Sequence, residues 1–141
     1  MPVTSEATAR WSGTLTGGDG EVALASTPGL TLPVTWASRS EGTGQTSTPE
    51  ELLGAAHAAC FSMAFAKVLG DEGTPPETIQ ATAAVTFSQG TGITGSHLLV
   101  SATVPGLTSE RFAELAEQAK QNCPVSVALA GVTVTLEASL A

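Results

Sequence analysis

The sequence is poor in aromatic side chains, with four phenylalanines, two tryptophans and no tyrosine among its 141 residues. Hydrophobic residues still make up 42% of the chain, which is enough for the core of one domain over residues 1–141. That core must consist mainly of Ala, Val, Leu and Thr, and small side chains bury little apolar area each. We therefore expect an oligomer that buries additional apolar surface.

Basic side chains are also scarce. Five Lys and Arg residues stand against thirteen Asp and Glu residues, so the formal net charge is −8. A surface with this balance repels phosphate groups, which argues against nucleic acids and anionic membranes as partners. The acidic excess mainly favours solubility.

Targeting and membrane-spanning segments are not evident in the sequence. The first twenty residues lack the basic stretch and apolar run of a secretory signal. We also expect no apolar stretch to reach the roughly 18–20 residues needed to cross a bilayer. These features together predict a soluble, cytoplasmic protein.

The chain has only two cysteines, Cys60 and Cys123, which lie 63 positions apart. In a reducing compartment a permanent disulfide is not the default state of such a pair. Two thiols there more often pack in the core, catalyse, sense redox state or bind a metal.

The polar and apolar pattern predicts strands interrupted by two main helices. Turn sequences such as TGGDG and QGTG separate alternating segments, as in β-hairpins. A polar loop is expected over 37–48. The order βββ-α-ββ-α-β predicts an α+β fold with antiparallel strands around a central buried helix. The strands are expected over 7–15, 21–26, 30–36, 77–88, 93–104 and 131–140, and the helices over 49–69, 109–122 and, as a short turn, 125–129.

The first long helix has a clear start signal and an unusual middle. Thr48 can cap it, Pro49 suits its first position, and Glu51 can complete a capping box. Its middle, GAAHAACFSMAFA over 54–66, is built mostly of small residues. Small residues let another backbone approach closely. The helix is also apolar over most of its circumference, which is typical of a central helix, so we expect Cys60 near its midpoint to be largely buried. That thiol either packs as a small hydrophobe or reacts, and both alternatives are open at this point.

Cys123 has a different setting, because Pro124 follows it directly. We place it at the junction of the second long helix and the short helical turn. As an N-cap it would lie near backbone N–H groups that stabilise a thiolate. Packing remains the alternative, and the spacing alone does not show that the two thiols meet.

Few charged or titratable groups are candidates for assisting the thiols. Arg39, in the polar loop, can lay a guanidinium over a pocket or simply be solvated. Glu50 complements the helix dipole, and it precedes Cys60 by about 15 Å along a straight helix. It would therefore act through Arg39 or from a second subunit. His57, three residues before Cys60, can lower the thiol pKa as an imidazolium or can be a packed, hydrogen-bonded histidine; nothing is assigned to His97.

Several segments together resemble the OsmC branch of the OsmC/Ohr family of thiol peroxidases. They are STPEELLGAAHAACFSMAFA, NCPVSVAL about sixty residues later, RWSGTL before a Gly-rich turn, and SRSEG before the helix. The likeness extends from about Trp11 to the C-terminus. The Val-Ser after the second cysteine, where the Ohr branch usually has Tyr-Ser, favours the OsmC branch. So does the position of Arg39, because the Ohr arginine lies near the N-terminus.

The resemblance implies a thiol-dependent peroxidase that prefers organic hydroperoxides to hydrogen peroxide and serves in stress defence. It also implies an intertwined homodimer with two sites at the interface. Carried over by position, Cys60 is the peroxidatic thiol and Cys123 the resolving thiol. Arg39 stabilises the thiolate, and Glu50 orients Arg39. The family has no metal or bound organic cofactor in this site, and its electrons come from an external dithiol, in related proteins of lipoyl type.

Three other functions remain as alternatives. His57, Cys60 and Cys123 could supply three ligands to zinc, although no CxxC or HxxxH pair supports such a site. A non-catalytic domain that binds an apolar ligand or a partner would use its thiols only for packing. A thiol or sulfur transfer to another acceptor is the third.

Overall fold

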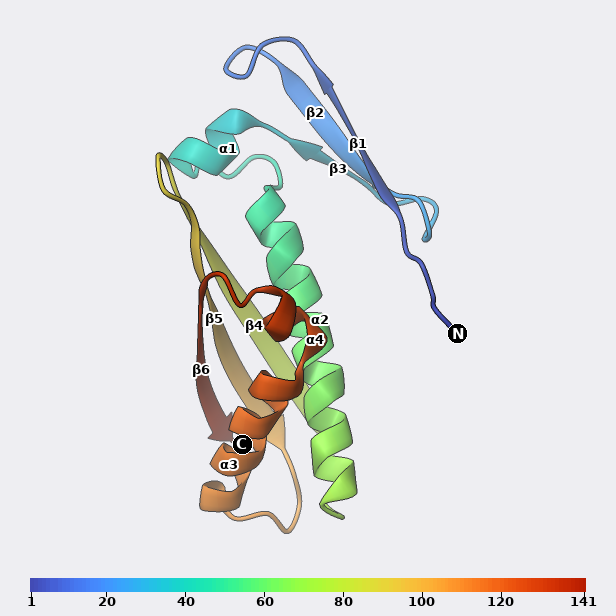
Figure 1. The fold of residues 1–141 in the computed structure, drawn as a ribbon, viewed down its shortest axis with the longest axis vertical. Helices are drawn as coiled ribbons and strands as arrows, with labels where there is room; N and C mark the ends of the chain where they lie inside the picture. Colours follow the sequence, from blue (N-terminus) through green and yellow to red (C-terminus); the bar gives the residue numbers. More distant parts are fainter. The chain divides into compact units, whose positions relative to one another are not determined.

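The computed structural model describes all 141 residues, which form two compact units, Met1–Leu52 and Leu53–Ala141. Figure 1 shows the succession of strands and helices, and it confirms the predicted α+β class. The single domain predicted from the length stays a prediction. The elements are β1 (Ala7–Ser12), β2 (Asp19–Leu24), β3 (Thr31–Val34), α1 (Trp36–Glu41), α2 (Pro49–Asp71), β4 (Thr78–Ser88), β5 (Gly92–Thr103), α3 (Ser109–Asn122), α4 (Pro124–Ala128) and β6 (Thr133–Leu140).

The first unit contains an antiparallel sheet in the order β1-β2-β3, which confirms the predicted hairpin. Trp11 of β1 lies opposite Gly20 of β2. A Cβ on Gly20 would lie 2.6 Å from the Trp11 ring, so only glycine leaves room for this indole. The sheet thereby holds a large aromatic side chain beside its tight turn.

The helix α1 lies where a polar loop was predicted, so that prediction is wrong for its first half. Thr35 caps the helix, because its Oγ1 accepts from the Ser38 N–H at 3.3 Å. Gly42 ends the helix in the left-handed region with φ 67°. The six residues of α1 are too few to show an apolar period, so this helix could not be predicted from the sequence.

The helix α2 begins with half of the predicted capping box. Thr48 Oγ1 accepts from the Glu51 N–H at 3.0 Å, as predicted. The Glu51 carboxylate, however, accepts from the Ser47 hydroxyl at 2.7 Å. Glu50 and Glu51 both lie in the first turn, where the helix dipole favours negative charge.

The second unit contains the other sheet, in the order β4-β5-β6. The β4 and β5 strands are antiparallel, as predicted, with Thr78 opposite Thr103. The last strand differs, because β6 pairs parallel to β5, with Gly95 opposite Thr133. Parallel neighbours need a crossover connection, and α3 with α4 provides it. The two helices were predicted, but their role as a crossover was not.

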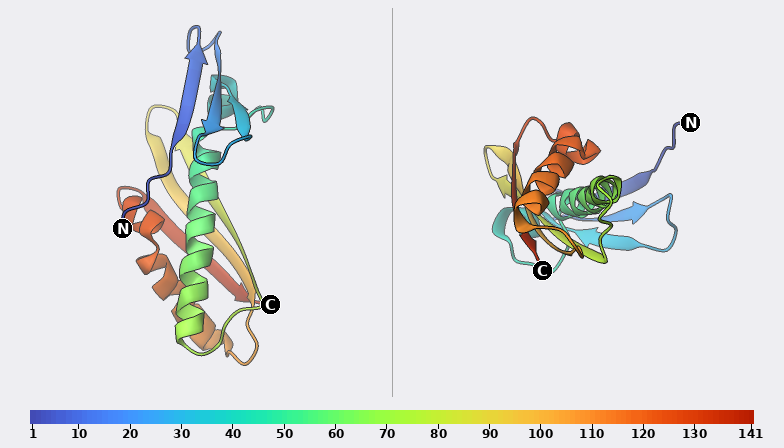
Figure 2. Two further views of the ribbon diagram at one scale, coloured as in Figure 1. Left: turned by 90° about the vertical axis from the view of Figure 1, so that its right-hand side faces the viewer. Right: turned by 90° about the horizontal axis from the view of Figure 1, so that it is seen from below.

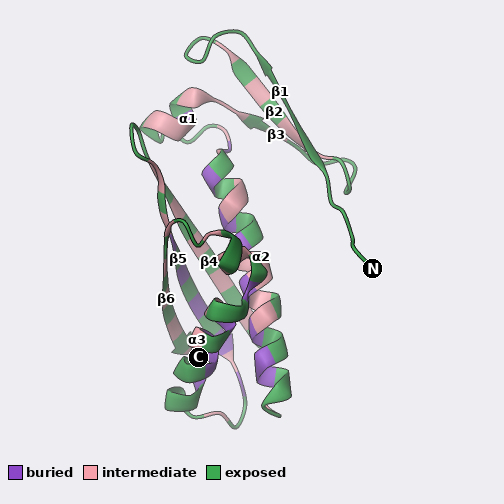
Figure 3. Ribbon diagram, viewed as in Figure 1, coloured by how far each residue is buried: buried purple, intermediate pink, exposed green.

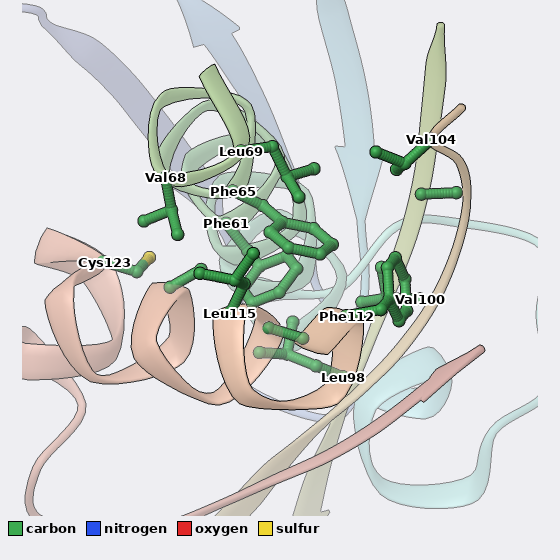
Figure 4. Packing of buried hydrophobic residues seen from close by; sticks show 13 residues of the cluster. Phe61, Phe65, Val68, Leu69, Leu98, Val100, Val104, Phe112, Leu115 and Cys123 are labelled. Atoms are coloured by element: carbon green, nitrogen blue, oxygen red, sulfur yellow. The ribbon is translucent and has the colours of Figure 1, made fainter. Parts of the chain in front are cut away.

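The core of the second unit lies between one face of this sheet and the helices α2 and α3 (Figures 2 and 4). In β5, Ser96, Leu98, Val100 and Ala102 alternate inward and are buried. The predicted apolar face of α3, which comprises Phe112, Leu115, Ala116 and Ala119, is confirmed. The helix α2 adds Phe61, Phe65, Val68 and Leu69, and Val104 and Cys123 complete the core from outside the helices and strands. The ring of Phe65 lies 5.5 Å from Phe61 and 5.3 Å from Phe112 between centroids.

The helix α2 is buried along one side and exposed along another within this chain (Figure 3). Ala55, Ala59, Met63 and Ala66 lie on the exposed side. The helix is long and apolar enough to cross a membrane, so the prediction that no stretch reaches this length is wrong. Its buried side packs in the protein core, however, so its length is not evidence of a membrane span.

Candidate active site

Cys60 lies near the middle of α2, beside the residues that anchor this helix in the core. Phe61 and Phe65 are fully buried, so they fix the rotation of the helix about its axis. Cys60 is consequently only partly buried, which is less than predicted. It borders a cavity of about 590 Å³. The other lining residues come from α2, α3 and the start of α4: Met63, Ala64, Lys67, Val68, Asp71, Gln118, Asn122 and Pro124.

Cys123 lies between α3 and α4 and is fully buried, with no exposed surface. Its N–H donates to the Ala119 carbonyl at 2.9 Å, which closes α3. Pro124 then occupies the first turn of α4, so Cys123 is the N-cap that the sequence predicted. Both helices fix its backbone, and its side chain belongs to the core cluster that includes Val68 (Figure 4).

The two thiols are free and hydrogen-bonded to each other. The fold therefore brings together two residues that the sequence places 63 positions apart. Burial raises the pKa of Cys60, and the hydrogen bond to Cys123 raises that pKa further. Burial would also raise the pKa of Cys123, but hydrogen bonds from Cys60, Ser126 and Val125 outweigh this effect and lower it. Within the second unit, the shared proton thus favours Cys60.

His57 lies one helical turn before Cys60 and has no exposed surface. Its Nδ1 lies 2.7 Å from Ser96 Oγ of β5, and its Nε2 lies 2.8 Å from Ser126 Oγ of α4. Burial lowers the pKa of His57, so the ring is neutral near pH 7. This arrangement agrees with the packed, hydrogen-bonded alternative and not with an imidazolium that acts on Cys60.

Ser96 and Ser126 are polar partners of His57 that were not predicted from the sequence. Ser126 belongs to the NCPVSVAL segment, but this motif does not show that its hydroxyl contacts His57. Ser96 carried no signal, because serine in an alternating strand is ordinary. Only the crossing of β5 by α2 shows that its hydroxyl faces His57.

Arg39 and Glu50 form an ion pair in the first unit. Arg39 Nη2 lies 2.8 Å from Glu50 Oε1, and Arg39 Nε donates to the same oxygen at 2.9 Å. The other oxygen, Oε2, is buried without a hydrogen-bond partner. Arg39 lies in the last turn of α1 and not in the predicted polar loop.

An apolar pocket of about 220 Å³ borders Arg39 in the first unit. Trp11 and Trp36 supply its aromatic surface, with Leu15 and Val34 beside them. The guanidinium is therefore next to apolar side chains, where a charge is screened less than in open water.

The geometry gives no support to a metal site. The chain contains no cluster of three or more His, Cys, Asp or Glu side chains that could hold an ion. Of the three ligands considered, His57 has both ring nitrogens engaged by serines. The four predicted site residues thus form two pairs, Cys60 with Cys123 and Arg39 with Glu50, which lie in different units.

Two free, hydrogen-bonded thiols on an α+β scaffold are typical of a thiol-based redox protein. Comparison with known proteins makes the assignment specific. The profile of the OsmC-like proteins matches residues 42–137, and the chain belongs to this family. The resemblance deduced from the sequence motifs is thereby confirmed.

Individual relatives support this assignment over nearly the whole chain. The chain is 39% identical over 132 residues to the Peroxiredoxin OsmC of Escherichia coli (strain K12), and the match covers 92% of each protein. It is 26% identical to an organic hydroperoxide resistance protein from Elizabethkingia anophelis, with a TM-score of 0.68 and complete coverage of both chains. An OsmC-like protein from Mycoplasma pneumoniae has the same fold, with a TM-score of 0.73 at 14% identity and 99% coverage of both chains.

Proposed function

We propose that this protein, a cysteine-based peroxidase by class, reduces organic hydroperoxides with Cys60 as the peroxidatic thiol and Cys123 as the resolving thiol. The observation that carries the proposal is the hydrogen bond between these two side chains. A resolving thiol must reach the oxidised sulfur, and the hydrogen bond between Cys60 and Cys123 supports this role because it keeps the two side chains next to each other. The names of the relatives, a peroxiredoxin and a hydroperoxide resistance protein, support the same reaction.

The reaction proceeds in three balanced steps. The Cys60 thiolate attacks one peroxide oxygen, the O–O bond breaks, and the alkoxide leaves and takes up a proton as the alcohol. The Cys60 sulfenic acid then condenses with Cys123, which forms a disulfide and releases water. An external dithiol, by family resemblance of lipoyl type, reduces this disulfide and becomes oxidised itself.

The first step needs Cys60 as the thiolate. The interactions within the second unit instead favour the thiolate on Cys123, because they lower the pKa of Cys123 and raise that of Cys60. Burial and the neighbouring thiol both raise the pKa of Cys60. A cation is needed to reverse this preference, and Arg39, held by Glu50, is our candidate. In this proposal a homodimer completes the site, with its two active sites at the interface.

The surroundings of Cys60 favour a peroxide with an apolar group. Met63, Ala64 and Val68 give the cavity an apolar wall beside the thiol. An alkyl or aryl group gains free energy by leaving water at such a wall, and hydrogen peroxide has no such group. We place the activity in the cytoplasm, where a dithiol reductant is available.

The test is peroxide consumption with dihydrolipoamide as the reductant. Wild type should turn over cumene hydroperoxide faster than hydrogen peroxide. Cys60→Ser should abolish the reaction, and Cys123→Ser should stop after one turnover unless a small thiol replaces the resolving step. Circular dichroism confirms that each variant is folded. Activity that survives Cys60→Ser would exclude this mechanism.

A further inference from the structure

A continuous line of hydrogen bonds connects β5 to the Cys123 thiol. It runs from Ser96 Oγ to His57 Nδ1 over 2.7 Å, and from His57 Nε2 to Ser126 Oγ over 2.8 Å. The Ser126 hydroxyl in turn hydrogen-bonds Cys123. Three separate elements, β5, α2 and α4, contribute one residue each before the line reaches the sulfur.

The interior of this line is closed to water. His57 has no exposed surface, and Ser96 is 2% exposed. A buried imidazole costs free energy unless both nitrogens are paired, and here both are. An apolar side chain of similar volume could fill the same space without burying any polar atom. The stability of the fold therefore does not require a histidine at this position. The line of hydrogen bonds ends at the Cys123 thiol, however, where it can affect the chemistry of the sulfur.

We propose that His57 is a positioning residue for Cys123, acting through the Ser126 hydroxyl to prepare this thiol for attack on the oxidised Cys60. The proposal rests on the function given above, in which Cys123 resolves the sulfenic acid. It concerns the second chemical step and leaves the attack on the peroxide to other groups.

The chemistry follows from the two tautomers of a neutral imidazole. When His57 Nε2 accepts from the Ser126 O–H, the Ser126 oxygen is free to accept from the Cys123 S–H. When Nε2–H donates instead, the Ser126 O–H turns to donate to the Cys123 thiolate. Ser96 complements either tautomer, since a hydroxyl both donates and accepts. One hydroxyl thus serves the thiol and the thiolate alike.

The condensation balances without any further reagent. The Cys123 sulfur forms a bond to the Cys60 sulfur while the S–O bond of the sulfenic acid breaks. The departing hydroxide combines with the proton that Cys123 gives up and leaves as water. His57 and Ser126 end the step with the protons they had at its start, so no external acid, base or oxidant is consumed.

The test is a thiolate titration of Cys123 in the Cys60→Ser background, followed by ultraviolet absorbance. Cys60 and, through Ser126, His57 are the titratable groups in hydrogen-bond contact with Cys123, so removing Cys60 isolates the line. Ser126→Ala should raise the Cys123 pKa by about one unit, because one charge-assisted hydrogen bond is lost. His57→Phe should raise it in the same direction. In the Ser126→Ala background, His57→Phe should add nothing further.

Controls separate positioning from a general loss of structure. His57→Gln keeps an amide that can donate to or accept from Ser126, so it should restore most of the wild-type titration. His97→Gln changes the other histidine, which is exposed, and should leave the Cys123 pKa unchanged. If His57→Phe does not fold, Ser126→Ala breaks the same line at a half-buried position. If the Cys123 pKa is the same with and without Ser126→Ala in the Cys60→Ser background, the proposal is overturned.

Kinetics with peroxide give a second, independent measurement. In the Ser126→Ala and His57→Phe variants, with both cysteines present, the sulfenic acid should form at least as fast as in wild type, because a Cys123 that holds its proton more tightly leaves the shared negative charge to Cys60. Its conversion to the disulfide should slow by about tenfold, and dimedone should trap more of it. If wild type does not reduce hydroperoxides, the proposed function fails while the titration still decides the role of His57. Equal rates of disulfide formation in all variants would overturn that role alone.

Discussion

Gly54 of α2 lies against the backbone of β4, where a Cβ would stand 2.7 Å from the Ala83 carbonyl oxygen. This contact explains one small residue in the helix by the packing of this chain alone. The neighbouring Ala55 and Ala59 differ, because they are exposed. Small residues in α2 therefore have two explanations, which separate variants can test.

Gly54→Ala should destabilise the protein although alanine is the better helix former. Overpacking against a backbone carbonyl costs about 1–3 kcal/mol, which exceeds the gain in helix propensity of about 1 kcal/mol. Urea unfolding monitored by circular dichroism measures the net effect. Gly70→Ala is the matched control, since nothing lies within 4 Å of its Cβ, and it should stabilise the protein slightly. Equal effects of both substitutions would contradict this view of the contact.

The exposed side of α2 should carry the dimer contact. Ala59→Trp places a large ring on that side, where we expect a partner helix to approach closely, and it should shift the protein from dimer to monomer. Ala113→Trp makes the same change at an exposed position of α3 and should leave the mass unchanged. Light scattering after size exclusion measures both. A monomeric wild type would rule out the proposed homodimer.

Arg39→Met should lower kcat/KM for cumene hydroperoxide by about a hundredfold, because a thiolate loses the charge that stabilises it. Glu50→Gln should have a smaller effect in the same direction, since it removes the carboxylate that holds the guanidinium at 2.8 Å. The pH dependence of Cys60 alkylation should move to higher pH in both variants. Arg10→Met, at an exposed arginine of β1, is the control. Arg39 has no part in the reaction if its removal leaves both measurements at the control level.

The stability of the protein should fall on acidification in a way that depends on His57. Burial lowers the pKa of this side chain in the folded state, whereas unfolded histidine titrates at about pH 6.5. Below that pH the unfolded state binds a proton that the folded state does not, so the free energy of unfolding decreases as the pH falls. Urea unfolding between about pH 7 and pH 5 should show this slope in wild type and His97→Gln. The slope should be smaller in His57→Gln, and an identical slope there would exclude the explanation.

The sequence predicted elements with strong local signals and missed those that depend on distant contacts. The helix α3 was placed at its observed limits because Thr108 caps it and its apolar period is regular. The short α1 has no such period and was taken for a loop. The parallel pairing of β6 was missed because strand orientation depends on the path of the whole crossover.

The candidate site shows the same division. The resemblance of the motifs named Cys60, Cys123, Arg39 and Glu50, and the fold joins them in two pairs. No spacing rule connects Ser96 with His57, which are 39 positions apart. Their contact exists because α2 crosses β5 at that point, so only the tertiary structure could show it.

The parallel β5–β6 pair has a consequence for the life of the nascent chain. The strand β6 leaves the ribosome after β5 and the two crossover helices, and non-local parallel pairing is slow because a long loop must first close. The crossover of α3 and α4, which carries Cys123, is attached to the sheet at both ends only after this pairing. Until β6 has paired, Cys123 is not held beside Cys60. A peroxide that reacts with Cys60 in this interval would leave a sulfenic acid with no thiol in position to condense with it. Newly made chains should therefore be more prone than mature ones to irreversible oxidation at Cys60.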